Sequence, residues 1–356
     1  MMLSFGFLTL NKKTEHEYFT EIGKRSAPLD IEIFCFSPED INPKTEYVHG
    51  KKFNSSTENW DDDIFPIPTY IYDRCFYASE EIIKKYSPIV NWLKNRKDIC
   101  FIGHGLPNKW KIHDILSSHS ILKYYIPETS KAANSEDIFK ALNKHKKIIL
   151  KPENGSQGRG IISLTLKGKQ IELQTHRHKN IIHKIFSKKE PLNKWLKQLL
   201  AAHSYLIQEY LSLVGEDMRP FDIRILLQKN KENNWHELGR GVRKGQEGHI
   251  ISNLHGGGDA HSFSEWLSSI DRTQQELLLD DIQTIITHLP ETLEENFGPL
   301  FELGVDLGVA KDGSIWILDT NSKPGHKTIL HTNPDVENSI YNAPLNYCKH
   351  IALQRS

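Results

Sequence analysis

Three oxygen-bearing side chains, those of Asp306, Asp319 and Asn321, interrupt two apolar runs near the end of the chain. The runs belong to the stretch FELGVDLGVAKDGSIWILDTNSKPG at 301–325, and the tetrapeptide AKDG at 310–313 separates them. An Asp-Gly pair between apolar runs is a strong indication of a β-hairpin. Because alternate residues of a strand project from the same face, Asp319 and Asn321 are predicted to share one face.

The length of the hairpin loop decides where Asp306 lies. A two-residue loop of Lys311 and Asp312 places Asp306 opposite Ile317 and makes Asp319 its diagonal neighbour, so that the acidic side chains converge. A three-residue loop would shift this parity. The convergence is therefore predicted on the condition of a two-residue loop.

Two carboxylates and a carboxamide on one face of an apolar hairpin are suited to bind Mg²⁺ together with nucleotide phosphates, because Mg²⁺ prefers oxygen ligands. A hairpin with one polar, solvated face is the alternative, since antiparallel sheets often expose one face to water. The other motifs of the chain must decide between the two.

A lysine and a glycine-rich loop follow an apolar strand in the sequence IILKPENGSQGRG at 148–160. The glycine order, G-x-x-G-x-G, is neither the dinucleotide fingerprint nor the P-loop. Glycine backbone can nevertheless approach an anion closely and direct its N–H groups at it, and Lys151 would add a positive charge. We expect phosphate binding here, and a flexible hairpin loop is the alternative.

A second lysine, Lys109, stands at the start of a helix predicted at 108–125, with Asn108 as its N-cap and Pro127 beyond its end. A lysine in the first turn gains nothing from the helix dipole. Lys109 is therefore expected to face an anion, with a solvated surface lysine as the alternative.

Charged and apolar residues alternate in the strand predicted at 222–228, where Asp222 and Arg224 share one face. The partner strand at 235–242 is followed by Arg243. Arginines beside an anion-binding loop favour a phosphate-facing role. Surface ion pairs, which contribute little stability, are the alternative.

The 356 residues carry no net charge and are 38% hydrophobic, as is typical of a soluble globular protein with two or three domains. Zero net charge argues against nucleic acid as the main partner. No apolar run approaches the roughly 20 residues of a membrane span, and the opening MMLSFGFLTL has no basic leader, so we expect neither membrane insertion nor a signal peptide. Four cysteines without CxxC pairing predict a reducing, cytoplasmic setting.

The N-terminal third is predicted to be a small open α/β unit. Strands at 3–10 and 31–36 flank a helix at 15–25, and a strand at 66–73 precedes a helix at 80–95. This unit lacks a phosphate-binding fingerprint. We therefore expect it to shape a substrate pocket rather than to hold nucleotide.

Taken in order, these motifs resemble the ATP-grasp superfamily. The resemblance is carried by LKPENGSQGRG, IQEYL at 207–211, DIRILL, an arginine followed by SNLHGGG at 252–258, and VDLGV with ILDTNSKPG. Three segments are further similar to the YheC/YheD-type branch, which is named for association with the endospore coat: PIPTYIYDR, RPFDIR and WILDTNSKPG. The individual motifs are loose, but five of them in this order, across nearly the whole chain, are specific.

The resemblance implies an ATP-grasp fold of α+β and α/β class, with two α+β lobes built on antiparallel sheets after a small open α/β domain. The implied domains are a pre-ATP-grasp domain at 1–105, an N-terminal lobe with the phosphate loop at 106–205, and a C-terminal lobe with the metal-binding hairpin at 206–356.

The resemblance also implies nucleotide contacts. Two lysines would bind the α and β phosphates, the glycine loop would form a flexible lid over the triphosphate, and the IQEYL segment would form the adenine hinge. These residues are Lys109, Lys151, Gly155, Ser156, Gly158, Gly160, Gln208, Glu209, Tyr210 and Leu211.

The implied metal ligands are Asp306, Asp319 and Asn321, which would hold two Mg²⁺ ions, with Mn²⁺ as a substitute. Asp319 stands where the family commonly has Glu, and its shorter side chain is less suited to bridge two ions. Our candidates for stabilising the transferring phosphoryl group or the tetrahedral intermediate are Arg224, Arg243 and Asn253.

The implied activity is that of an ATP- and Mg²⁺-dependent carbon–nitrogen ligase, which joins a carboxylate to an amine through an acyl phosphate and forms an amide or peptide bond. The partners would be ATP and a small carboxylate and amine, such as an amino acid or peptide, and a homo-oligomer is compatible with the sequence. The alternatives are a spore-coat-associated or structural ATP-binding protein with little turnover, and a kinase. The completeness of the ATP apparatus favours the ligase.

Overall fold

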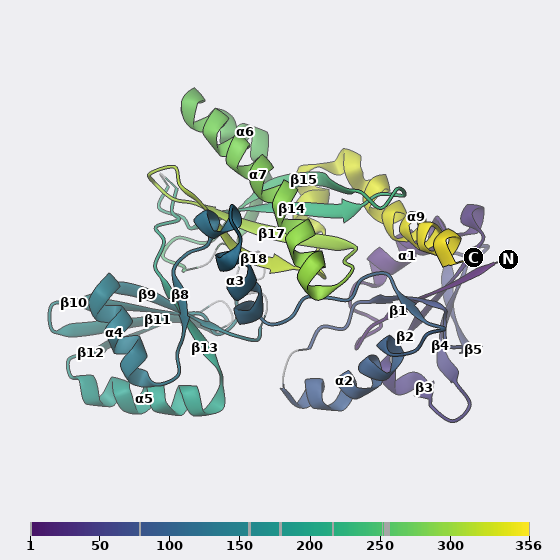
Figure 1. The fold of residues 1–356 in the computed structure, drawn as a ribbon, viewed down its shortest axis with the longest axis horizontal. Helices are drawn as coiled ribbons and strands as arrows, with labels where there is room; N and C mark the ends of the chain where they lie inside the picture. The colour runs from purple at the N-terminus through teal and green to yellow at the C-terminus, as the bar shows by residue number, and fades with distance from the viewer. Residues whose placement is uncertain are drawn as a thin grey trace.

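Three β-sheets follow one another along the chain (Figure 1). They are seen in a computed structural model, which describes residues 2–77, 80–155, 158–177, 180–215, 217–250, 252 and 257–355. The mixed α/β content and the antiparallel pairing of the second and third sheets agree with the predicted fold class.

The first sheet has seven strands in the order β3-β4-β2-β1-β6-β7, with β5 paired to β4. Its centre is parallel, because β1 pairs in parallel with both β2 and β6. This arrangement confirms the predicted β-α-β opening. The elements are β1 (Leu3–Leu8), α1 (His16–Lys24), η1 (Ala27–Leu29), β2 (Ile31–Phe36), η2 (Pro38–Asp40), β3 (Ile41–Asn42), β4 (Tyr47–Asn54), β5 (Asn59–Pro66), β6 (Tyr70–Asp73), α2 (Glu80–Lys94) and β7 (Cys100–Phe101).

A connecting helix, α3 (Lys109–Ser118), and a short turn of helix, η3 (Leu122–Tyr125), lead into the second sheet. The single helix predicted at 108–125 is wrong at its end, because the chain leaves the helical conformation at His119, whose ψ is 138°. Nδ1 of His119 then accepts the N–H groups of Ile121 and Leu122, at the position where η3 begins.

The second sheet has six strands in the order β12-β11-β10-β9-β13-β8. Helices α4 and α5 cover one face, where Ile138 and Leu196 pack with Ile148 and Leu150 of β9. Alternation along β9 therefore directs Lys151 to the opposite face. The elements are β8 (Thr129–Lys131), α4 (Ser135–His145), β9 (Lys147–Pro152), β10 (Ile162–Lys167), β11 (Gln170–Arg177), β12 (Asn180–Phe186), α5 (Lys189–Ala202) and β13 (Tyr205–Glu209).

The third sheet has five strands in the order β16-β15-β14-β17-β18. Two helices lie between β16 and β17, because the side chain of Asp271 accepts the N–H of Thr273 and caps the start of the second one. The elements are β14 (Phe221–Lys229), β15 (Trp235–Lys244), β16 (Asp259–Ser262), α6 (Phe263–Ser268), α7 (Arg272–Phe297), β17 (Glu302–Val309), β18 (Ile315–Asn321), α8 (Lys327–Thr332), η5 (Pro334–Val336) and α9 (Glu337–Arg355).

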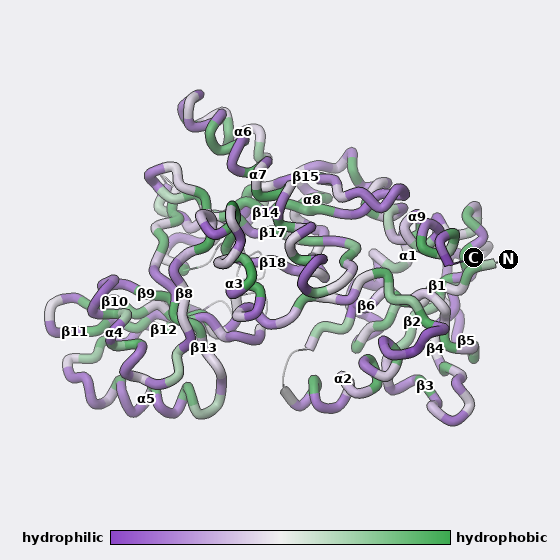
Figure 2. The backbone as a smooth tube through the Cα atoms, in the orientation of Figure 1, coloured by the Kyte–Doolittle hydropathy of each residue, from purple (hydrophilic) through white to green (hydrophobic). Residues whose placement is uncertain are grey.

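Separate apolar clusters cover the two faces of the third sheet. Ile223, Ile225 and Leu227 of β14 pack with α7 on one side, whereas Leu226 belongs to a cluster that includes residues of β1, α1 and α9 on the other. In Figure 2 the strands β14 and β17 are coloured mainly as hydrophobic. Helix α5, which covers the second sheet, alternates between hydrophobic and hydrophilic colours. The second face of β14 thus connects the third sheet to the N-terminal region, beside which α9 and the C-terminus lie (Figure 1).

No helix in the described ranges combines the length and the apolar character needed to cross a bilayer.

Candidate active site

The hairpin of β17 and β18 has a three-residue loop. The N–H of Ala310 bonds to the carbonyl of Ser314, and Gly313 has a φ of 86°. The predicted two-residue loop is therefore wrong, and so is the pairing of Asp306 with Ile317.

A second irregularity restores the predicted convergence. Asp306 pairs with Asp319 and Leu307 with Ile317, so Leu318 is an extra residue in β18. One residue added in the loop and one added in the strand cancel, because side chains alternate with a period of two. Asp306 and Asp319 consequently lie directly opposite each other, and Asn321 lies on the same face, opposite Gly304.

The arginines of β14 and β15 converge on the same carboxylates. Nε and Nη2 of Arg243 donate to the two oxygens of Asp222 at 2.6 and 2.8 Å, and Nη2 lies 3.0 Å from Oδ1 of Asp306. Ser252 also donates to Asp222. Burial opposes the charge of Arg243, but Asp222 and Asp306 outweigh burial and hold the pKa of Arg243 above its usual value. Because both of its bonds to Asp222 fix the guanidinium, Arg243 is a residue that positions Asp306.

Arg224 is partly buried, and two buried nitrogens of its guanidinium have unused hydrogen-bonding capacity. Its Nε lies 3.0 Å from Oδ1 of Asp306, yet neither this oxygen nor Nε and Nη1 of Arg224 has a hydrogen-bond partner among the described residues. Burial lowers the pKa of Arg224, and Asp306 acts in the opposite direction. A Cβ at Gly304 would collide with Nη1 of Arg224, so glycine at 304 leaves the space that the guanidinium occupies. Unpaired buried polar groups are costly, which points to a ligand that completes their bonding.

Lys109 lies where the sequence analysis placed it, in the first turn of α3. The N-cap prediction is confirmed, because the side chain of Asn108 accepts the N–H of Lys111. Nζ of Lys109 is 2.5 Å from Oδ1 of Asp319, so its ion-pair partner in this structure is a carboxylate of the hairpin. Glu153 joins this helix to the phosphate loop, since its carbonyl accepts the N–H of Lys109 at 3.2 Å and its carboxylate accepts Nδ2 of Asn108 at 2.8 Å.

Lys151 extends from β9 toward the same group of charges. The pKa of Lys151 is lowered to about 8, mainly by burial and also by the positive charge of Lys109, while Asp319 and Asp306 act in the opposite direction. An anion that binds beside Lys151 would raise this pKa again, because it favours the charged ammonium. The protonation of Lys151 should therefore depend on whether a phosphate is bound beside it.

The glycine-rich loop follows Lys151 and Pro152. Gly158 and Gly160 have φ angles of 69° and 76°, which only glycine adopts at little cost. The loop is fixed at its end, where the hydroxyl of Tyr205 donates to the carbonyl of Gly160 at 3.2 Å. Gly155 is exposed, and Ser156 lies outside the described residues.

The predicted adenine hinge at 208–211 lies at the end of β13. Gln208 is buried on the sheet face that carries Lys151. Glu209 lies on the opposite face, where its carboxylate accepts the N–H of Glu128 and lies near His145. The N–H of Tyr210 bonds to the carbonyl of Lys147, so the amide of this hinge residue is already engaged in the sheet.

The sequence analysis missed several charged residues behind the site. Glu153, described above, is one, and Arg74 and Glu302 are two more, both fully buried. Glu302 stands inside an apolar strand, and Arg74 directly follows one. A charge in such a position predicts a partner, although not which one. Asn253, the third candidate for transition-state stabilisation, lies outside the described residues.

The sequence pattern of the YheC/D-like ATP-grasp family matches residues 98–351. The endospore coat-associated protein YheC of Bacillus subtilis (strain 168) is 41% identical over 355 residues, which cover 100% of this chain and 98% of the relative. The chain belongs to the YheC/D-like ATP-grasp family. The endospore coat-associated protein YheD of the same organism is 24% identical over 306 residues, 84% of this chain and 66% of the relative.

Solved ATP-grasp structures have the same fold. D-cycloserine synthetase DcsG aligns with a TM-score of 0.57 and 11% identity, over 99% of this chain and 100% of that one. The D-alanine-D-alanine ligase from Coxiella burnetii aligns with a TM-score of 0.53 and 11% identity, over 99% and 96%. The fold of this YheC/D-like protein is therefore the ATP-grasp fold, which generally binds ATP with a divalent metal ion.

The acidic face of the hairpin fits a divalent ion. Its donors are oxygens, from Asp306, Asp319 and Asn321, and Oδ1 of Asp306 is buried without a hydrogen-bond donor in the described structure. Hard cations such as Mg²⁺ prefer this donor set. The cations that now lie beside these oxygens, Lys109 and Arg224, also carry the charge expected around phosphate.

Proposed function

We propose that this protein is an ATP- and Mg²⁺-dependent carboxylate–amine ligase that forms an amide or peptide bond. One observation carries the proposal: cationic groups of α3 and β9 lie near two opposed carboxylates of the hairpin, and the partly buried Arg224 beside them has two nitrogens without a hydrogen-bond partner among the described residues. Such a set of charges suits phosphoryl transfer, where the protein mainly positions and neutralises. Structurally similar proteins include enzymes named as ligases and synthetases.

The proposed reaction has two balanced steps. A substrate carboxylate oxygen attacks the γ-phosphorus of ATP, and the bond to ADP breaks, which gives an acyl phosphate and ADP. An amine then attacks the acyl carbon, phosphate leaves, and the amine loses a proton. The product is lighter by one water than the summed carboxylic acid and amine.

The chain's own residues would divide the work in this reaction. Lys151 and Lys109 bind phosphate oxygens, and the Gly155–Gly160 loop supplies N–H groups over them. Arg224, whose Nε and Nη1 make no hydrogen bond among the described residues, would donate to the transferring phosphoryl group or to the tetrahedral oxyanion. Arg243 holds Asp306 in place through its bonds to Asp222.

Asp306, Asp319 and Asn321 would hold two Mg²⁺ ions, or Mn²⁺. When bound, such ions neutralise charge that develops on phosphate oxygens. Asp319 makes this set differ from the glutamate common in the family, and a shorter carboxylate favours binding one ion over bridging two. ATP would lie between the second and third sheets with its adenine near Gln208.

The test is ADP release by the full-length protein with Mg-ATP, screened against pooled amino acids and small peptides, with mass spectrometry on each active pool. We expect ADP release coupled to a product that has lost one water. Asp319→Ala and Lys151→Ala are expected to abolish Mg-ATP binding or turnover while the circular dichroism spectrum stays that of the wild type. Unchanged affinity and turnover in both variants would refute the site assignment.

A second candidate function is that of a coat-associated ATP-binding protein with little turnover, in the cytoplasm or on the spore. The names of both Bacillus subtilis relatives favour it. Calorimetry separates the two functions: Mg-ATP binding without ADP release in any pool would support the structural protein. Steady ADP release without an amide product would instead indicate a kinase.

A further inference from the structure

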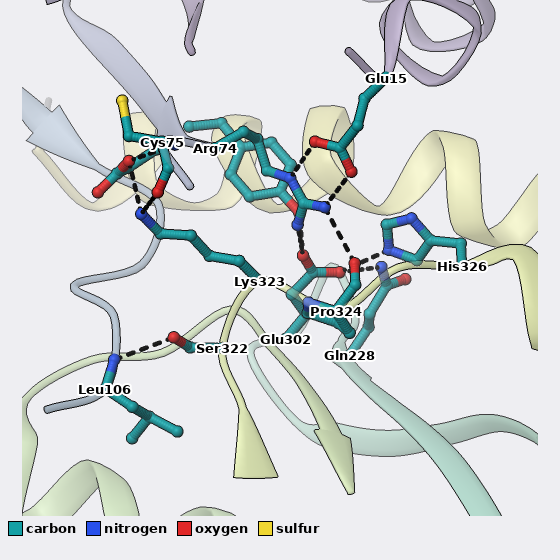
Figure 3. A network of polar contacts seen from close by, with 12 residues as sticks. Glu15, Arg74, Cys75, Leu106, Gln228, Glu302, Ser322, Lys323, Pro324 and His326 are labelled. Carbon is teal, nitrogen blue, oxygen red and sulfur yellow. Dashed lines mark hydrogen bonds and ion pairs between the residues drawn. The ribbon is translucent and has the colours of Figure 1, made fainter. Parts of the chain in front are cut away.

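A buried charge network lies at the base of the metal-binding hairpin, where β17 begins (Figure 3). Glu302 accepts Nη1 of Arg74 at 2.6 Å and Nε2 of Gln228 at 3.0 Å, and it also bonds to the hydroxyl of Tyr72. Nε2 of His326 lies 2.9 Å from its second oxygen. Four groups from three regions of the chain thus surround one carboxylate.

Arg74 connects this carboxylate to two other places. Its guanidinium donates to both oxygens of Glu15 at the start of α1, with Nε at 2.9 Å, and Nη2 donates to the carbonyl of Pro324 at 2.9 Å. Burial opposes the charge of Arg74, but Glu15, Tyr72 and Glu302 outweigh burial and raise its pKa. Its Nη1 therefore binds the N-terminal region to the hairpin, and its Nη2 binds the N-terminal region to the segment after the hairpin.

The segment 322–326, which directly follows the proposed metal ligand Asn321, is held at nearly every residue. The hydroxyl of Ser322 accepts the N–H of Leu106 at 2.9 Å. Lys323 lies 2.7 Å from Oδ1 of Asp73 and donates to the carbonyl of Cys75 at 3.1 Å. Pro324 and His326 are held by the contacts described above, and the His326 ring also stacks on Tyr18, with centroids 4.4 Å apart.

Each of the two regions supplies a cation to the other. The segment gives a cation, Lys323, to the N-terminal carboxylate Asp73, and the N-terminal region gives a cation, Arg74, to the backbone carbonyl of Pro324. Figure 3 shows Arg74 between Glu15 and Glu302 while Lys323 points to Cys75 on its other side. These contacts restrain Asn321 from the C-terminal side, as the pairing with β17 restrains it from the N-terminal side.

We propose that Arg74 and Lys323 are positioning residues that set the proposed metal ligand Asn321 through the segment 322–326. The N-terminal region then contributes to metal binding without touching the ion, in addition to any contact with substrate. The inference rests on the proposed function, because it takes the hairpin as the metal site. Groups that orient metal ligands typically change metal affinity by about 10–100-fold when removed.

The test compares nucleotide binding with and without Mg²⁺ in full-length variants. In Arg74→Lys the charge is kept, but one ammonium cannot bridge Glu15, Glu302 and the Pro324 carbonyl as the planar fork does. Lys323→Met removes only the contacts of Lys323 with Asp73 and Cys75 and leaves the buried network around Glu302 intact. Calorimetry with ADP measures the affinity without Mg²⁺ and the Mg²⁺ concentration that gives half of the full gain in affinity.

We expect each variant to bind ADP without Mg²⁺ within about twofold of the wild type, because Lys109 and Lys151 are untouched. The Mg²⁺ concentration for the half-maximal gain is expected to rise by about 10-fold or more. Lys229→Met is the matched control, since Lys229 of β14, in the same sheet, forms an ion pair with Glu294 of α7 rather than with the segment 322–326. It should lower stability and leave the Mg²⁺ dependence unchanged.

The outcomes separate the two proposals. A wild-type protein whose ADP affinity does not respond to Mg²⁺ overturns the proposed function, and this inference with it. A wild-type protein that responds, together with variants that show the wild-type Mg²⁺ dependence, overturns the inference alone. If Arg74→Lys fails to fold, Lys323→Met decides. An equal loss of affinity with and without Mg²⁺ would assign the network a purely structural role and also overturn the inference.

Discussion

Two buried carboxylates lie four residues apart on one face of β17, and their surroundings differ. Glu302 accepts hydrogen bonds from Arg74, Tyr72 and Gln228. Its second oxygen also contacts His326, so both oxygens are bonded. Asp306 also faces arginines, yet its Oδ1 accepts no hydrogen bond within the described part of the chain. The same strand therefore carries a completed charge cluster at its start and an incomplete one at its centre.

The difference teaches how to separate structure from function in this fold. A buried cluster whose charged groups are all paired holds elements together, and its loss is costly. A buried cluster with unused donors and acceptors keeps a cost that a ligand can relieve. The first cluster should therefore respond to mutation in stability, and the second in activity.

The largest effect on stability is expected at Glu302. Glu302→Ala leaves Arg74 and His326 without their shared carboxylate and should lower the free energy of unfolding by about 3–5 kcal/mol. Urea denaturation measures it. Asp62→Ala, in an exposed pair with Lys51, is the control and should change stability by no more than about 0.5 kcal/mol. A loss below about 1 kcal/mol for Glu302→Ala would contradict the structural role assigned to this cluster.

The largest effect on activity is expected at Asp306. Asp306→Asn keeps the shape but removes the charge between Arg224 and Arg243, and it should lower kcat by about 100- to 1000-fold. Steady-state ADP release measures kcat once a substrate pool is known. Turnover within about threefold of the wild type would show that this carboxylate does not serve the reaction.

Arg224 sharpens the comparison, because activity and stability should move in opposite directions. Arg224→Met removes a desolvated guanidinium with unpaired donors, so the free energy of unfolding should stay equal or rise. Turnover should fall about 100-fold. Denaturation and ADP release are measured on the same preparation, and a loss of stability as large as that of Glu302→Ala would place Arg224 among the structural ions.

The smallest effect is a pH dependence from Lys151, whose pKa burial lowers to about 8. Phosphate prefers the ammonium, so Mg-ATP affinity should be steady below pH 8 and fall by up to about tenfold per pH unit above it. The unfolded chain keeps this proton up to about pH 10.4, so unfolding binds a proton between these values and this group's contribution to stability rises with pH. Calorimetry from pH 7 to 9.5 measures the affinity.

Lys151→Met provides the control for that titration. Its Mg-ATP affinity should be low and free of the slope above pH 8. A variant that retains the wild-type slope would assign the titration to another group.

The sequence predicted the parts of the site that depend on local pattern. The hairpin, the N-cap at Asn108 and the shared face of Asp222 and Arg224 follow from turn chemistry and alternation, and the structure has all three. The register of the hairpin was wrong, because turn composition did not reveal a three-residue loop or the extra residue Leu318. Asp306 and Asp319 still converge, since two shifts of one residue cancel.

The amino-acid sequence by itself determined which residues carry chemistry: the lysines, the glycine loop and the acidic hairpin, in an order that indicates the family. Only the tertiary structure decided which charges are completed and which are left open. Arg74 and Glu302 are 228 residues apart, yet they share a buried hydrogen bond. Pairing at such separation depends on how sheets and loops pack, because a local pattern fixes the face on which a charge lies and not the partner that it meets.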